Sequence, residues 1–373
     1  MSFSFVWPLY TLFGFIFIFG GLEMAIKQRL YKSIILAALA LALIGLATFR
    51  TVGVGSDDPA YESMFMHMPS FFDCEGFLCD YSYSQFNIEV GFFTLLSLLS
   101  SISTSHYLLF GFISSVAIIY NIKSIKYFTP HVGAATLVYF SHFYLNKELN
   151  AIRLGLASAI LFWAATYAAR KKYLAMWALV LGATCIHVSS VLFIVPFLLY
   201  SRISNRAVYA VGGLALLGFA TMIDLKLLFS YATNFGFIGE KIELYLNADM
   251  YSYALPLLSA VNCKNVIIVI LSLIWWKRLS EKYEHFPLIF CFFYCATFLR
   301  IVLGDFAIFA GRSYAAISMF EYVLLPAVVF VIFGRWAGYL IIGIYSLVTL
   351  YLNLTTNPGW AGEADVFFDF FNL

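Results

Sequence analysis

The stretch from Phe49 to Phe65, FRTVGVGSDDPAYESMF, gathers side chains that could do chemistry within one short span. Arg50 offers a planar guanidinium that can bind phosphate through two parallel hydrogen bonds and stays charged at any working pH. Asp57 is a candidate general base, and Tyr61 follows it by four residues, so both could share one helix face. The stretch therefore predicts a site that binds an anionic group and accepts a proton.

Each of these residues also has a structural interpretation. Arg50 could be an interfacial anchor at a helix end, with its charged head reaching toward water. The sequence Gly-Ser-Asp-Asp-Pro is rich in turn formers, so Asp57 or Asp58 could cap a helix that starts near Pro59. Capping and catalysis do not exclude each other, and both interpretations stay open.

Arg153 is a second candidate for binding phosphate, because it lies inside a predicted helix away from the basic clusters of the chain. Small residues follow it, so a neighbouring helix could approach closely and bury the guanidinium. A buried arginine needs a partner, either a carboxylate such as Asp57 or Glu148, or a lipid phosphate.

Three more residues complete the set of candidates. His187, near the end of a predicted span, rivals Asp57 as the base because the pKa of imidazole is close to neutral, although a packing hydrogen bond would explain it equally well. Arg300 and Arg312 stand at or near helix ends on the predicted outer side and could bind phosphate with Arg50 and Arg153.

Several classes of site are excluded by missing motifs. The chain has no GxxxxGK[ST], no HExxH and no GxSxG, so nucleotide hydrolysis, zinc proteolysis and serine esterase chemistry lack their signatures. No cysteine or histidine spacing fits a metal site, so we expect neither a metal nor another cofactor. Cys74 and Cys79, five residues apart in CEGFLC, are candidates for a disulfide in an oxidising compartment.

The elements that position these residues are membrane helices. Hydrophobic residues make up 62% of the 373 positions and charged residues only 11%, which is typical of an integral membrane protein. The net charge of +2 gives no reason to expect a nucleic-acid partner. Because lipid offers the backbone no hydrogen-bond partner and no alternating barrel pattern is present, we predict an all-α transmembrane bundle.

Apolar runs of suitable length suggest about twelve spans. They are Ser4 to Leu22, Ser33 to Phe49, Tyr107 to Ile122, Val132 to Leu145, Ala151 to Ala169, Tyr173 to His187, Val188 to Tyr200, Ala207 to Ile223, Val266 to Trp276, Phe286 to Val302, Tyr314 to Phe333 and Ala337 to Leu354. Placing the basic loops inside the cell puts both termini outside if Glu89 to Ser103 is an interfacial or re-entrant helix. The loops at about 50–88 and 224–264 then face outward.

Four sequence elements resemble the EpsG-type polysaccharide polymerases, which belong with the Wzy polymerases of O-antigen, capsule and exopolysaccharide synthesis. The first is R-x-x-x-x-G-x-D-x-x-x-Y, formed by Arg50, Gly55, Asp57 and Tyr61. The others are E-x-G-F from Glu89, then NAIRLGLASAI and CIHVSSVLFIVP. Leu154 stands where the family commonly has glutamine.

The resemblance implies a GT-C-like bundle forming one polymerase domain over residues 1–373. Such an enzyme would be a metal- and nucleotide-independent glycosyltransferase of the bacterial inner membrane with a periplasmic active site. It would transfer a growing glycan from one undecaprenyl diphosphate to the nonreducing end of another lipid-linked repeat unit, in O-antigen (lipopolysaccharide) or other polysaccharide synthesis. Its partners would be these lipid-linked oligosaccharides and membrane lipids, with a chain-length regulator protein as a candidate. A lipid-linked oligosaccharide flippase and an O-antigen ligase are the alternatives.

Overall fold

The computed structural model describes all residues of the chain except 27, 73–87, 204, 223–253, 357–358 and 370–373. The predicted Cys74–Cys79 disulfide and most of the predicted loop 224–264 lie outside the described residues. Every named element in the described part is helical, with one isolated antiparallel bridge between Gly55 and Ala361. The predicted all-α class is thus confirmed for the part of the chain that is described.

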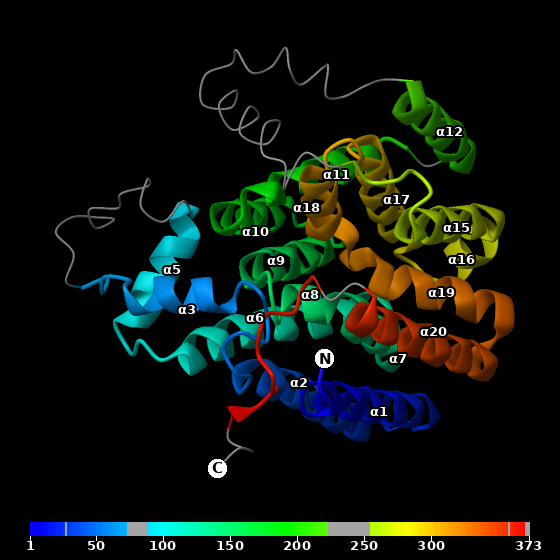
Figure 1. The fold of residues 1–373 in the computed structure, drawn as a ribbon. Coiled ribbons are helices and arrows are strands. Elements are labelled where there is room, and N and C mark those ends of the chain that lie inside the picture. The colour runs from blue at the N-terminus through cyan, green and yellow to red at the C-terminus, as the bar shows by residue number, and fades with distance from the viewer. Residues whose placement is uncertain (27, 73–87, 204, 223–253, 357–358, 370–373) are drawn as a thin grey trace, which may run out of the picture. The chain divides into compact units, whose positions relative to one another are not determined.

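The chain forms two compact units, residues 1–191 with 332–373, and residues 192–331. The helices of the first unit are α1 (Phe3–Ala25), α2 (Arg29–Thr48), α3 (Asp58–Met66), α5 (Val90–Ser100), α6 (His106–Phe128), α7 (Val132–Val138), the π-helix η1 (Tyr139–Tyr144), α8 (Leu145–Lys147), α9 (Ile152–Ala169), α10 (Tyr173–Ile186) and α20 (Arg335–Thr355) (Figure 1). The prediction of one domain over the whole chain remains a prediction.

The second unit holds the remaining helices. They are α11 (Ile194–Tyr200), α12 (Arg206–Met222), α15 (Ala260–Ile274), α16 (Trp276–Lys282), α17 (Phe286–Val302), α18 (Ala307–Ile317), the 3-10 turn η3 (Ser318–Phe320) and α19 (Glu321–Phe333). The short helix η2 (Val188–Phe193) contains the boundary between the units. Since α15 begins at Ala260, the end of the predicted loop 224–264 is already helical.

Six helical segments of the described part are long and apolar enough to cross a membrane, and one of them is the continuous run Ala307–Phe333 formed by α18, η3 and α19. The count becomes seven if α15 and α16, which are bent by 79° at their junction, form one span. Five further apolar helices have only 10–17 residues, fewer than the roughly 20 that the hydrocarbon core requires. The predicted number of about twelve spans is therefore not confirmed, because apolar composition alone counted these shorter helices as crossings.

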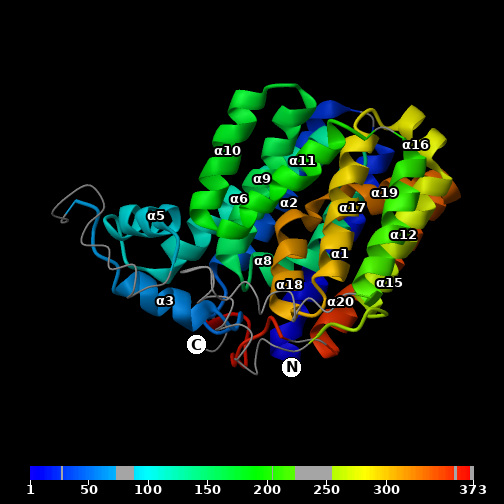
Figure 2. The ribbon, with the colours of Figure 1, turned by 90° about the horizontal axis from the view of Figure 1, so that it is seen from above.

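The core of the first unit is built around α9, which packs against both α6 and α10 (Figure 2). Small residues allow close backbone approaches at the ends of these helices. A Cβ added at Gly155 of α9 would lie 2.4 Å from the carbonyl oxygen of Lys147 on α8, and one added at Gly91 of α5 would lie 2.7 Å from that of Cys185 on α10. These glycines therefore let α8 approach α9 and let α5 approach α10.

A C-terminal segment, residues 359–369, lies against the loop that joins α2 to α3; we call it the C-terminal strap. Thr51 N–H donates to the carbonyl of Phe367 at 2.9 Å, and Ser56 N–H donates to that of Trp360 at 3.0 Å. Gly362 N–H donates to the carbonyl of Val54 at 2.9 Å. The strap supplies hydrogen-bond partners to backbone groups that the loop cannot pair internally, so it fixes the shape of the loop.

Candidate functional site

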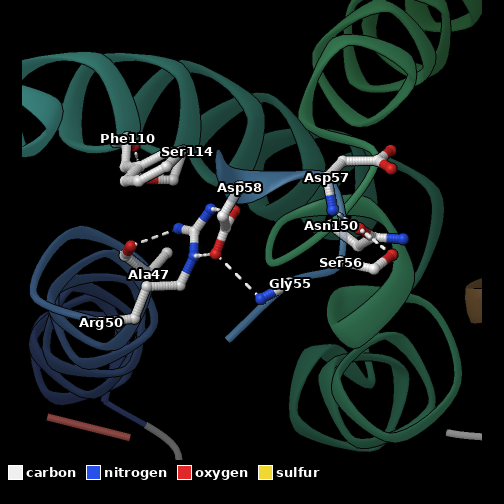
Figure 3. A network of polar contacts seen from close by, with 9 residues as sticks. All are labelled: Ala47, Arg50, Gly55, Ser56, Asp57, Asp58, Phe110, Ser114 and Asn150. Carbon is white, nitrogen blue, oxygen red and sulfur yellow. Dashed lines mark hydrogen bonds and ion pairs between the residues drawn. The ribbon is translucent and has the colours of Figure 1, made fainter. Parts of the chain in front are cut away.

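Arg50 forms a fully buried ion pair with Asp58 at the end of α2 (Figure 3). Its Nε donates to Asp58 Oδ2 at 3.0 Å, and its Nη2 donates to Oδ1 at 2.7 Å. The third nitrogen, Nη1, donates to the carbonyl of Ala47, and the guanidinium lies 3.8 Å from the centre of the Phe110 ring. Every nitrogen of Arg50 thus has a protein partner, so in this arrangement the side chain holds the loop in place.

The loop between α2 and α3 is also held from the other side by the turn before α9. Asn150 Oδ1 accepts hydrogen bonds from Asp57 N–H at 2.8 Å and from Ser56 Oγ at 3.1 Å. A Cβ added at Gly55 would lie 1.8 Å from the carbonyl oxygen of Leu149, so only glycine fits there. Figure 3 shows the Asp57 carboxylate, on an exposed residue, pointing away from the Arg50–Asp58 pair.

The Glu89 carboxylate binds residues from the two other sequence motifs, NAIRLGLASAI and CIHVSSVLFIVP. Its Oε2 accepts from Arg153 Nη1 at 2.9 Å, and its Oε1 accepts from the backbone N–H of Val188 at 3.0 Å. Glu89 directly precedes α5, Arg153 lies in the first turn of α9, and Val188 follows the end of α10. One carboxylate therefore fixes the relative positions of three helix ends. The carboxylate partner of Arg153 is Glu89, and not Asp57 or Glu148.

Arg153 keeps hydrogen-bonding capacity that the protein does not use. A cation in the first turn of a helix faces the positive end of the helix dipole, so the Glu89 carboxylate is needed to offset that repulsion. The Arg153 side chain is 22% exposed, while its Nε–H is buried and has no hydrogen-bond partner among the described residues. The guanidinium carbon lies 5.9 Å from the centre of the Phe92 ring. Glu89 therefore holds Arg153 at Nη1, while the Nε–H can still donate a hydrogen bond to a ligand.

Tyr61 is buried beside the same group of residues. Burial raises the pKa of its phenol to about 12, although the positive charge and the backbone of Arg153 act in the opposite direction. Asp57 and Glu89 contribute to the rise through their negative charges. The phenol therefore stays protonated at working pH and can donate a hydrogen bond, close to a cation and two carboxylates.

His187 ends α10 and marks the break in the predicted pair of spans. Its backbone is extended, with φ of −151° and ψ of 118°, and the chain then continues into η2. The ring is buried, and its Nδ1 lies 2.7 Å from Ser189 Oγ and accepts from Ser189 N–H at 3.3 Å. His187 directly precedes Val188, whose backbone N–H donates to Glu89, so the backbone beside the imidazole is held by the Glu89–Arg153 pair.

Three of the four sequence elements singled out above lie in the first unit, and the fourth begins there and continues into the second. A family model matches residues 33–364 of this chain. The chain belongs to the EpsG family. The convergence gives physical roles to its signature residues, since Gly55 and Gly91 permit close backbone contacts while Arg50, Glu89 and Asn150 bind the elements to one another.

Among characterised proteins, this EpsG-family chain is similar to the amylovoran biosynthesis protein AmsC of Erwinia amylovora. The two are 25% identical over 276 residues, which cover 73% of this chain and 72% of AmsC. No solved structure matches the chain.

The structure brings some of the predicted site residues together and places others elsewhere. Tyr61 has charge interactions with Asp57 and Arg153 within the first unit, and Arg50 pairs with Asp58 in the loop that also carries Asp57. Arg300 and Arg312 belong to the second unit, where Arg300 Nε donates to Asn262 Oδ1 at 3.1 Å and Arg312 is exposed on α18. Their roles, like those of the other predicted site residues, remain predictions.

Sequence reasoning missed three residues that build the site. Asp58, and not its neighbour Asp57, is the partner of Arg50, and the adjacent aspartates give no signal that would distinguish them. Glu89 appeared only as part of a motif, and Asn150 was not considered although it opens the NAIRLGLASAI element. No group of three or more His, Cys, Asp or Glu residues that could hold a metal ion is found in the described part of the chain.

Proposed function

We propose that this EpsG-family protein is a polysaccharide polymerase of the bacterial inner membrane with its active site on the periplasmic face. It would transfer a growing glycan from undecaprenyl diphosphate to the nonreducing end of another lipid-linked repeat unit, without a metal or nucleotide. Membership of the family and the similarity to AmsC, a protein named for amylovoran biosynthesis, support a role in exopolysaccharide synthesis. The six long apolar helices support a multi-pass membrane location.

The proposed reaction is a displacement at the anomeric carbon of the donor sugar. The acceptor hydroxyl oxygen forms a bond to this carbon, and the bond from the carbon to the diphosphate oxygen breaks. The diphosphate leaves with the bonding electrons, and the hydroxyl proton passes to a base. We assign the base to Asp57, whose residue is exposed beside Tyr61. We keep the buried His187 as the second candidate, because it directly precedes Val188, whose backbone N–H donates to Glu89.

The observation that carries this proposal is the unpartnered Nε–H of Arg153. A buried donor without an acceptor costs roughly 1–3 kcal/mol, so a site that keeps one is suited to a ligand that supplies the acceptor. A diphosphate oxygen fits, because guanidinium binds phosphate by parallel hydrogen bonds. The neighbouring Tyr61 hydroxyl is a donor for the same diphosphate or for the sugar. Arg50 would act by positioning the loop, and Arg300 and Arg312 remain proposed phosphate contacts of the second unit.

The test is Arg153→Lys, compared with wild type in a strain lacking its own copy of the gene. Lysine keeps the positive charge opposite Glu89 but lacks the planar guanidinium that donates two parallel hydrogen bonds. We therefore expect long glycan chains to disappear while the protein still inserts and accumulates. Loss of one charge-assisted hydrogen bond to phosphate, about 1.5–3 kcal/mol, corresponds to at least about tenfold slower turnover. A normal glycan ladder from this variant would rule out the proposed phosphate contact.

Arg170→Lys is the matched control, because Arg170 lies at the opposite end of α9, is exposed and stacks on Tyr127 at 4.4 Å. It should give a wild-type glycan ladder at equal protein level.

Deletion of the gene separates the classes of function. Surface glycan reduced to single capped repeats indicates a polymerase, whereas complete loss of surface glycan indicates a transporter. A full-length glycan that accumulates on its lipid carrier indicates a ligase.

A further inference from the structure

An apolar groove runs along the first unit between α1 and α2, with a volume of about 310 Å³. It is lined by residues from the first half of α1, the second half of α2 and the C-terminal strap: Trp7, Pro8, Thr11, Leu12, Phe15, Ala42, Gly45, Leu46, Phe49 and Phe368. No charged side chain is among them, and the volume lies at the lower end of the range typical of ligand sites. The ligand that suits this surface is a hydrocarbon chain.

The length and composition of the two helices suit a groove at the depth of the lipid tails. Both helices are long and apolar enough to span the membrane, and the lining residue Phe15 is half exposed. From Trp7 to Phe15 the groove follows α1 over eight helical rises, about 12 Å. Half of the hydrocarbon core is about 15 Å thick, so the groove extends from the helix ends to near the middle of the bilayer.

One end of the groove coincides with the start of the candidate site. Phe49 lines the groove and is followed directly by Arg50, the first residue of the loop that carries Asp57. Phe368, on the strap, lines the groove, while its neighbour Phe367 is buried and accepts a hydrogen bond from Thr51 N–H. A lipid whose tail occupied the groove would have its headgroup at this loop.

We infer that the groove binds the first isoprene units of the polyprenyl chain of a lipid-linked diphosphate. The inference rests on the proposed function, and the position of the groove at the signature loop favours this lipid over a bulk phospholipid. Four aromatic rings, those of Trp7, Phe15, Phe49 and Phe368, give the walls broad apolar surfaces suited to a methyl-branched chain. Occupancy would place the headgroup end of the lipid beside Phe49, at the start of the loop that carries Asp57.

The experiment uses a photoreactive isoprenyl diphosphate, with the full-length protein in membranes and labelled peptides identified by mass spectrometry. We expect label within residues 7–15 and 42–49, and its removal by excess unlabelled undecaprenyl diphosphate but not by phosphatidylglycerol. A photoreactive phosphatidylglycerol is the second probe. If it labels these peptides equally and the unlabelled diphosphate does not displace it, the groove holds ordinary lipid and the inference is wrong.

Two glycine variants provide a matched pair for the same assay. An added Cβ at Gly45, in the groove, or at Gly14, on α1 outside its lining, would meet no heavy atom within 4 Å. Gly45→Leu should fill the groove and lower isoprenyl labelling at least about fivefold, while Gly14→Leu should leave it unchanged. Equal labelling of the Gly45→Leu variant and wild type would overturn the inference.

The labelling assay needs no glycan transfer, so the two proposals can fail separately. If the groove peptides are not labelled but Arg153→Lys still abolishes long chains, the inference about the groove fails and the proposed function stands. If the groove is labelled while gene deletion leaves glycan length unchanged, the lipid site stands and the polymerase proposal fails.

Discussion

Replacing Asp58 by asparagine removes one charge and leaves the buried guanidinium of Arg50 without its counterion. Both side chains are completely buried, and two hydrogen bonds of 3.0 and 2.7 Å join them. Breaking a buried pair by neutralising one partner costs about 3–5 kcal/mol, because the remaining charge stays desolvated. Asparagine preserves the volume and one acceptor oxygen, so the loss comes mainly from the charge.

The expected effect is measurable as a thermal midpoint of the purified protein in detergent. For a unit of roughly 230 residues, each kcal/mol corresponds to about 2–4 °C, so Asp58→Asn should lower the midpoint by about 6–20 °C. Asp57→Asn is the matched control, since Asp57 is adjacent but exposed. It should leave the midpoint within about 2 °C of wild type and still lose polymerisation if Asp57 is the base.

A double variant tests the physical reason for the loss. Arg50→Met combined with Asp58→Asn removes the orphaned charge, while the asparagine oxygen can still accept from Gly55 N–H, as Asp58 Oδ2 does at 2.8 Å. Because buried ion pairs can be replaced by neutral residues of similar volume at little cost, the double variant should recover part of the midpoint. If Asp58→Asn is as stable as wild type, or Asp57→Asn is equally unstable, the reasoning about the pair is wrong.

Two further predictions concern the packing around the site. Burial raises the pKa of Glu148 to about 7, against the hydrogen bond from Tyr139. Its folded-state pKa is therefore above the unfolded value, so wild type should lose up to about 3 kcal/mol as pH rises from about 4.5 to 7, whereas Glu148→Gln should not. Parallel unfolding curves for the two proteins at pH 5 and pH 8 would contradict this. A Cβ added at Gly362 would lie 2.3 Å from the carbonyl oxygen of Gly53, so Gly362→Ala should displace the strap, expose the loop to protease and shorten the glycan. Gly14→Ala, where an added Cβ meets no heavy atom within 4 Å, should behave as wild type, and equal protease sensitivity of the two variants would contradict the role of the strap.

The positions of the helices could be predicted from the sequence because apolar runs mark them directly. The run from Phe286 to Val302 coincides with α17, and the run ending at Ala169 coincides with α9 to within one residue. The number of crossings could not be predicted, since apolar composition does not show whether a short helix crosses the bilayer. The break at His187 lies where the sequence placed it, but the helices on its two sides are each too short to span the bilayer alone.

Partners within the site were harder to predict than its members. The motifs identified Arg50, Arg153 and Gly55 as important, but the carboxylate opposite Arg153 lies 64 residues away at Glu89. Nothing local in the sequence links these two positions, whereas Glu148 is five residues from Arg153 and Asp57 lies in the predicted outward loop, and both have the same charge as Glu89. The choice between Asp57 and Asp58 depends on which of two adjacent side chains points inward, and that requires the fold.

The pairing of the strap with the signature loop also fixes an order of events during biosynthesis. Gly55 and Ala361 form a bridge although about 300 residues separate them in the chain. At a synthesis rate of roughly 5–20 residues per second, the loop must wait about 15–60 s for its partner to emerge. A ribosome that stops before the strap would release a protein whose helices are inserted but whose loop lacks these backbone partners. Completion of this loop thus depends on translation having reached the strap.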